Sequence, residues 1–177
     1  MNKNKTAATL ILLSALIGCD SKTAPTPANF TNTLNAFYLE HPECLFPDAP
    51  RFPLETSDPA QIKQFDSLVK AQLLDAGKET GMKVNRYTVT TGGNRYAPRF
   101  CFGHRNVTAI DSFTPPTPEN GFPTTHVTYR FNLADVPIWA KTPEVQAAFP
   151  AMAKATTSEF TAQATLAKTI GGWTVPN

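Results

Sequence analysis

The sequence predicts an α+β fold in which N-terminal helices precede a largely antiparallel sheet, all within one domain. Two segments before residue 77 carry apolar residues at helical spacing, and from Lys83 onward the pattern changes to the alternation typical of strands. Helices followed by a run of strands are typical of α+β domains. Sixteen prolines among 177 residues also argue against a helical bundle.

Two helices are expected in the first half of the chain. The first covers residues 30 to 40, where apolar side chains recur at helical spacing until Pro42. The second begins at Asp58, a capping residue followed by proline, and ends at Gly77. Its expected apolar face consists of Ile62, Phe65, Leu68, Val69, Leu73 and Ala76.

The middle of the chain is expected to form strands. A hairpin is predicted between residues 87–90 and 99–102, joined through the Gly92-Gly93 turn. A further strand over 107–113 is followed by a proline-rich loop over 114–123.

A strand over 125–133 shows the clearest alternation of apolar and polar residues. A short helix over 143–149 then leads to two closing strands, 160–170 and 173–175, joined by Gly171-Gly172. Trp139 and Trp173 are interpreted as core residues.

The N-terminus has the layout of an export signal, with two lysines, an apolar run from Ala7 to Ile17 and a small residue before Cys19. The apolar run is too short to span a bilayer, which takes roughly 20 residues. The segment Leu16-Ile17-Gly18-Cys19 resembles the lipobox of bacterial lipoproteins. This resemblance implies that the signal is cut before Cys19 and that this cysteine is acylated.

Acylation would anchor the mature protein to a membrane of the bacterial cell envelope. The expected organisation is a signal peptide over residues 1–18, a lipidated, proline-containing tether over 19–28, and one domain over 29–177. Asp20 resembles the signal that retains lipoproteins at the inner membrane of enteric bacteria, but the choice between inner and outer membrane stays open.

The two other cysteines, Cys44 and Cys101, are expected to form a disulfide, because exported chains meet an oxidising compartment and the remaining number is even. The loop that this bond closes would stabilise the domain by about 4 kcal/mol in the chain-entropy model. Two buried free thiols are the alternative.

Basic residues gather between Lys78 and Arg105, where Glu79 is the single acid. Residues 58–102 resemble the second helix and wing of winged-helix domains, and that resemblance implies DNA binding. Export excludes contact with the chromosome, and a net charge of +2 gives nucleic-acid binding no support. The segment is either a solvated surface or a contact for anionic lipid or an acidic protein, with Lys83, Arg86, Arg95, Arg99 and Arg105 as candidates.

A second candidate contact surface is the polar face of the 125–133 strand, which carries His126, Thr128 and Arg130. Such a face meets either solvent or a partner.

No catalytic motif is present in the sequence. The serines lie outside any G-x-S-x-G context, and the three histidines lack metal-ligand spacing. His41 and His104 each lie three positions from a cysteine, so the disulfide would bring them near one another and near Glu43. Structural histidines are the favoured interpretation, and no cofactor or metal is expected.

The sequence therefore favours a non-catalytic interaction or structural module, anchored in the envelope by lipid. One alternative is a small-ligand binder with a pocket under the 114–123 loop. The other is a hydrolase of cell wall or lipid, which needs a cleft where a histidine meets a serine or carboxylate.

Overall fold

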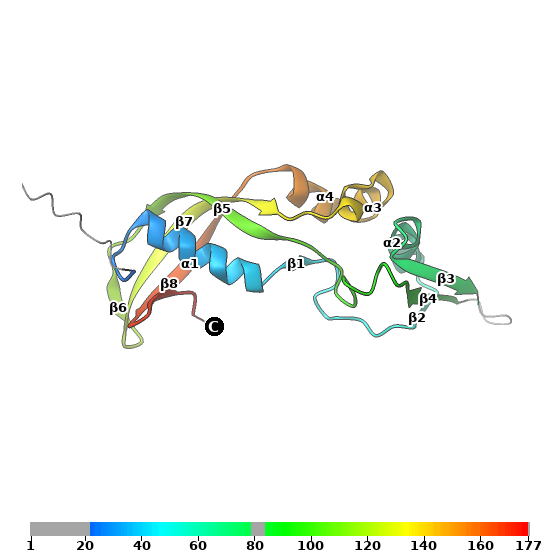
Figure 1. Cartoon of the computed structure of the whole chain (residues 1–177), viewed down its shortest axis with the longest axis horizontal. Coiled ribbons are helices and arrows are strands. Elements are labelled where there is room, and N and C mark those ends of the chain that lie inside the picture. Colours follow the sequence, from blue (N-terminus) through cyan, green and yellow to red (C-terminus); the bar gives the residue numbers. More distant parts are fainter. Residues whose placement is uncertain (1–21, 79–83, 177) are drawn as a thin grey trace, which may run out of the picture.

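The computed structural model describes residues 22–78 and 84–176 as an elongated molecule (Figure 1). Its apolar side chains form two separate clusters. One cluster lies at the end that contains α1 (Pro27–Glu40), called the α1 end, and the other at the end that contains α2 (Pro59–Lys70), called the α2 end. The predicted signal peptide and Cys19 lie outside the described residues.

A six-stranded antiparallel sheet forms the α1 end. Its strands follow the order β1-β5-β7-β8-β9, and β6 pairs with β7 beside that path. The bounds are β1 Glu43–Cys44, β5 Cys101–Phe113, β6 Thr117–Glu119, β7 Phe122–Ala134, β8 Phe160–Thr169 and β9 Gly172–Thr174. The prediction of an α+β fold with a largely antiparallel sheet is confirmed.

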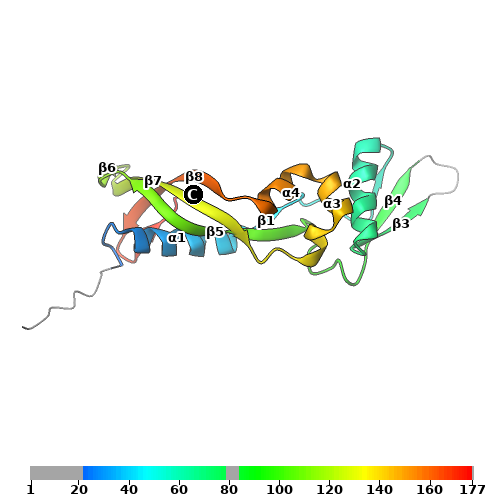
Figure 2. The same ribbon diagram turned by 90° about the horizontal axis from the view of Figure 1, so that it is seen from above.

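Helix α1 lies along one face of this sheet (Figures 1 and 2). The helix begins where Thr26 Oγ1 accepts a hydrogen bond from the Asn29 backbone N–H at 3.3 Å and Pro27 takes the first turn. The apolar side chains of Phe30 and Leu34, both fully buried, pack on the sheet. The rest of this cluster is Val107, Val127, Tyr129, Phe131, Leu166 and Trp173.

The α2 end combines α2 with a three-stranded antiparallel sheet in the order β2-β4-β3. These strands are β2 Leu54–Thr56, β3 Leu74–Lys78 and β4 Asn85–Val89. The 3₁₀ helix η1 (Ile138–Lys141) and the helices α3 (Pro143–Ala148) and α4 (Pro150–Thr157) complete this part. Buried members of its cluster include Phe65, Leu68, Tyr87, Phe100 and Trp139.

The predicted disulfide between Cys44 and Cys101 is confirmed. The two cysteines face each other in paired strands β1 and β5. The closed loop of chain contains β2, α2, β3 and β4, so one covalent bond closes the base of the whole three-stranded unit.

The predicted second helix is too long. Helix α2 ends at Lys70, and residues 74–78 form β3 instead of further helix. Gln72 adopts a left-handed φ of 61°, the Leu73 N–H donates to Leu68 O, and the Gln72 N–H donates to Val69 O. This is the Schellman arrangement that ends helices, formed here with glutamine where glycine is usual.

The predicted hairpin between residues 87–90 and 99–102 is wrong. Strand β4 pairs with β2 and β3, whereas β5 pairs with β1 and β7. Residues 91–100 form successive turns between them. Gly93 fits there because its Cα lies so close to Leu73 that an added Cβ would stand 2.1 Å from the Leu73 carbonyl oxygen.

The expected loop over 114–123 contains strand β6, which forms a hairpin with the start of β7. The turn consists of Asn120 and Gly121, both at positive φ, as expected for the Asn-Gly type of two-residue hairpin turn. At the other hairpin, Thr169 pairs with Gly172, so the turn is Ile170-Gly171 instead of the predicted Gly171-Gly172. Helix α4 was not expected.

The packed part of the chain begins before the expected boundary at Asn29. The indole N–H of Trp173 donates to Ala24 O at 3.1 Å, and the Lys22 backbone lies against Gly172. The predicted tether is therefore shortened at its C-terminal side. Among the described residues, none of the helices has the length and apolar character needed to cross a membrane.

Candidate functional site

The polar face of β7 is exposed as predicted. Val127 and Tyr129 are buried against α1, whereas His126 and Arg130 point outward and Thr128 is half-buried. The alternation follows from the pleat of the strand, which directs successive side chains to opposite faces.

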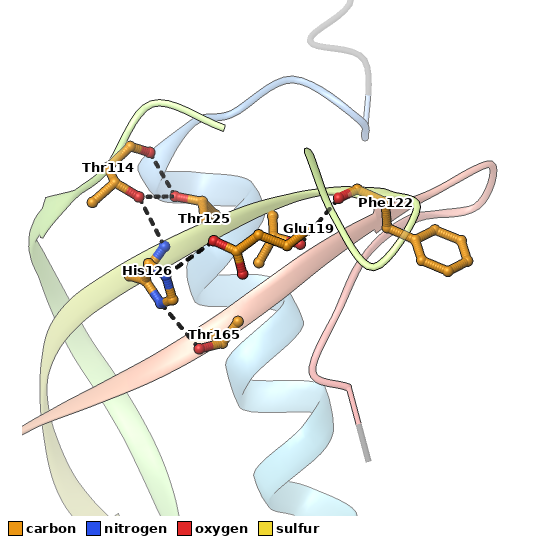
Figure 3. Close-up of polar contacts among 7 residues, drawn as sticks. Thr114, Glu119, Phe122, Thr125, His126 and Thr165 are labelled. Carbon is orange, nitrogen blue, oxygen red and sulfur yellow. Dashed lines mark hydrogen bonds and ion pairs between the residues drawn. The ribbon is translucent and has the colours of Figure 1, made fainter. Parts of the chain in front are cut away.

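His126 lies in a polar cluster at the α1 end (Figure 3). Its Nδ1 is 3.1 Å from the hydroxyl oxygen of Thr165, and its Nε2 is 3.5 Å from a carboxylate oxygen of Glu119. The His126 backbone N–H donates to Thr114 Oγ1 at 3.0 Å. The cluster joins β6, β7 and β8 across the sheet.

This cluster supplies the contacts that the hydrolase hypothesis needs, but on an open surface. The side chain of His126 is 56% exposed and that of Glu119 is 44% exposed. Charge stabilisation in hydrolytic enzymes works in sites from which water is excluded. The histidine and the carboxylate therefore meet on a water-exposed sheet face and not in an enclosed site.

Arg130 is occupied by two acids of the same sheet face. Its Nε lies 3.0 Å from Asp111 and its guanidinium 3.3 Å from Glu159. The hydrogen bond and charge of Asp111, with the charge of Glu159, raise the pKa of Arg130. The positive charge is neutralised locally, which weakens the interpretation of Arg130 as a site for an acidic partner.

Arg105 is also engaged within the molecule. Its Nε donates to Glu43 at 2.7 Å, and its guanidinium lies 5.1 Å from the ring centre of Tyr38 and 4.8 Å from that of Phe131. These contacts tie β1 and α1 to the sheet. Arg105 therefore belongs to the structural framework.

The other predicted basic residues separate in space. Arg86 lies on β4, 3.6 Å from Glu55 of β2. Arg99 is exposed in the turns before β5, and Lys83 lies outside the described residues. The basic residues between Lys78 and Arg105 do not form one continuous surface. The strands of the hairpin predicted within this segment belong to different sheets.

Arg95 lines an open hollow of about 660 Å³ at the α2 end. Its guanidinium lies 5.0 Å from the ring centre of Tyr96, and Tyr96 packs edge-on against Trp139 with 5.6 Å between ring centres. Lys70, at the end of α2, adds a second cation to the lining. No ion pair with another described residue is formed by either Lys70 or Arg95.

The hollow combines positive charge with an apolar wall. Ile138, 86% exposed, lies at its edge beside Trp139. Within the described part of the chain, the buried indole nitrogen of Trp139 has no hydrogen-bond partner. Two cations beside aromatic and aliphatic side chains form a surface that suits a ligand with both a negative and an apolar group.

This hollow was missed by sequence reasoning because it combines three distant segments. Lys70 ends α2, Arg95 lies in the turns after β4, and Trp139 lies in η1. Arg95 was identified as a candidate for its charge alone. Trp139 and Trp173 are 6% and 7% exposed, so their assignment to the core is confirmed.

The remaining histidines make structural contacts. His41 stacks on Phe37 and its Nδ1 lies 2.7 Å from the Phe37 carbonyl oxygen. His104 is 3.6 Å from Asp135, and Glu43 is turned to Arg105. In residues 22–78 and 84–176, no group of three or more His, Cys, Asp or Glu side chains is arranged to hold a metal ion.

The small-ligand hypothesis placed its pocket under residues 114–123. Beneath this segment the buried Thr125 hydroxyl donates to Thr114 O at 2.7 Å, and no residue of 114–123 lines the hollow that contains Arg95.

Comparison with known proteins gave no match to a family model, to a curated protein or to a solved structure.

Proposed function

We propose that this protein is a lipid-anchored binding protein of a bacterial cell envelope, held to a membrane through Cys19, and that it binds its partner in the hollow at the α2 end without catalysing a reaction. The observation that carries the proposal is that Lys70 and Arg95, which form no ion pair with a described residue, line the same hollow as the apolar side chains of Ile138 and Trp139.

The hollow lies far from the expected anchor, which supports a soluble partner or a segment of another envelope protein. The first described residues pack against β9 at the α1 end, whereas the hollow lies at the α2 end (Figure 1). A lipid anchor at Cys19 would therefore hold the hollow away from the membrane surface. An acidic protein segment with apolar side chains fits this arrangement better than a lipid headgroup.

A small anionic ligand is the second candidate. A volume of about 660 Å³ falls within the range of small-molecule sites. The two candidates differ in the size of the bound species. Variants of the hollow can therefore be tested for binding to intact proteins and, separately, for binding to small molecules.

Mass spectrometry of the intact protein tests the predicted lipid anchor at Cys19. Intact protein isolated from membranes of its native host is expected to lack residues 1–18 and to carry acyl groups on Cys19. Cys19→Ala is expected to release the protein from the membrane fraction. Full-length protein with a free Cys19 thiol in the cytosol would contradict the anchor.

The hollow is tested by cross-linking in intact cells. A photoreactive amino acid at Ile138 is expected to capture the partner, and one at Leu39, which is exposed on α1, serves as the control position. Arg95→Glu is expected to abolish the product from position 138. Arg99→Glu, an exposed charge reversal outside the hollow, is expected to leave it unchanged. A product that survives Arg95→Glu would contradict the proposal.

A further inference from the structure

Two hairpin tips at the α1 end expose large apolar side chains. Ile170 occupies the β8–β9 turn and is fully exposed, and Phe122 follows the β6–β7 turn and is 52% exposed. Both tips lie at the same end of the elongated molecule in the two views (Figures 1 and 2). Isolated exposed apolar residues are common, but two at adjacent hairpin tips call for a reason.

The side chains at the β6–β7 tip separate by polarity. Glu119 extends toward His126, whereas the ring of Phe122 points away from that polar cluster (Figure 3). The aromatic ring is therefore presented outward and the carboxylate is held back on the sheet face.

The start of the described chain lies at the β8–β9 tip. An added Cβ at Gly172 would lie 3.3 Å from the Lys22 carbonyl oxygen, and Trp173 holds Ala24 by a hydrogen bond of 3.1 Å. Lys22 is exposed there, and Lys168 lies two positions before Ile170. The β8–β9 tip therefore brings together the chain start, an exposed isoleucine and two lysines.

Only three peptide steps separate Lys22 from Cys19 in the sequence. A chain extends by at most about 3.6 Å per residue, so three steps reach roughly 11 Å. An acyl group on Cys19 therefore confines the β8–β9 tip to the immediate neighbourhood of the lipid surface.

We infer that the α1 end is a membrane-contact surface, in which Ile170 and Phe122 insert into the interface of a phospholipid bilayer beside the acyl anchor. This inference rests on the proposed anchoring at Cys19 and adds an orientation to it. With these side chains inserted, the long axis of the molecule points away from the bilayer. The hollow with Arg95 then faces the aqueous compartment. Lys22 and Lys168 lie where they meet anionic headgroups.

The test uses the mature, acylated protein that begins at Cys19, in vesicles of phosphatidylethanolamine and phosphatidylglycerol whose acyl chains are brominated near the headgroup. Ile170→Trp and Phe122→Trp each add a fluorophore at a tip, and Ile138→Trp adds one at a position of the α2 end that is 86% exposed. Emission of the parent protein, which contains Trp139 and Trp173, is subtracted.

The inference expects the added emission of Ile170→Trp and Phe122→Trp to shift to shorter wavelength and to lose most of its intensity in brominated vesicles. The added emission of Ile138→Trp is expected to stay unchanged. Equal quenching at all three positions would overturn the orientation. A blue shift without vesicles that grows with protein concentration would show contact between copies of the chain and would also overturn it.

Flotation of the same samples separates this inference from the anchor itself. Acylated protein that floats with vesicles but shows no quenching at position 170 or 122 overturns the membrane-contact surface and leaves the anchor standing. Protein that does not float with the vesicles overturns both.

Discussion

The guanidinium of Arg105 donates to the carboxylate of Glu43 across 2.7 Å, directly beside the disulfide between Cys44 and Cys101. Burial lowers the pKa of Arg105, but the hydrogen bond and the charge of Glu43 raise it, and the net shift is upward. The ion pair and the covalent bond together fix the short strand β1 to β5 at the junction between the two ends of the molecule.

Arg105→Ala is therefore expected to lower the free energy of unfolding by about 1 to 3 kcal/mol, because it removes a charged hydrogen bond and the contacts with two aromatic rings. Arg130→Ala is the matched control, since its ion pairs lie on the exposed sheet face and are screened by water. Urea denaturation followed by circular dichroism measures both. A loss for Arg130→Ala as large as that for Arg105→Ala would contradict the structural role of Arg105.

The disulfide is expected to stabilise the α2 end more than the α1 end. The closed loop spans a sequence separation of 57 residues, and its removal in Cys44→Ser/Cys101→Ser is expected to cost about 4 kcal/mol in the chain-entropy model. Hydrogen exchange should increase most in the three-stranded sheet, which lies inside the loop. An increase confined to α1 and β8 would contradict this expectation.

Local periodicity accounts for what the sequence predicts well. The first helix follows from the spacing that starts at Phe30, and the exposed face of β7 follows from the alternation around Val127. The disulfide follows from the number of cysteines and the expected compartment. Each of these depends on neighbouring residues or on a simple count.

Partners distant in sequence account for what was missed. Strand β4 pairs with β2, whose register sets Leu54 opposite Tyr87, and no local pattern identifies that partner. The hollow likewise needs Arg95 and Trp139 to meet, although more than forty positions separate them. The Asn120-Gly121 turn was missed for another reason. This dipeptide is a local hairpin signal, but the prolines around it favoured the interpretation as a loop.

A hydrogen-bonded pair of tyrosines, of which Tyr129 is fully buried, predicts how stability changes in alkaline solution. Tyr129 is fully buried and hydrogen-bonded to Tyr38 through the two hydroxyl groups. Burial, followed by the hydrogen bond with Tyr38, raises the pKa of Tyr129 above its usual value of 10.0. The folded protein then keeps a proton that the unfolded chain releases above this pH.

The stability supplied by the raised pKa is fully present below about pH 10 and is lost as pH rises toward the folded-state pKa. In that window each pH unit is expected to lower the free energy of unfolding by about 1.4 kcal/mol for this one group. Urea denaturation at about pH 9 and about pH 11 measures the slope. Tyr129→Phe is expected to flatten it, and equal slopes in the two proteins would contradict the assignment.

The turn that ends α2 can be tested with two substitutions that are expected to change the free energy of unfolding in opposite directions. Gln72 has a left-handed φ of 61°, which costs a residue with a Cβ more than it costs glycine. Gln72→Gly is expected to raise the free energy of unfolding by about 0.5 to 1 kcal/mol, after the greater freedom of glycine in the unfolded chain is counted. Gly93→Ala is expected to lower it by about 3 kcal/mol, because its Cβ would stand 2.1 Å from the Leu73 carbonyl oxygen. Urea denaturation measures the stability of both variants. A destabilised Gln72→Gly would contradict the strain at Gln72, and an unchanged Gly93→Ala would contradict the close approach of Gly93 to Leu73.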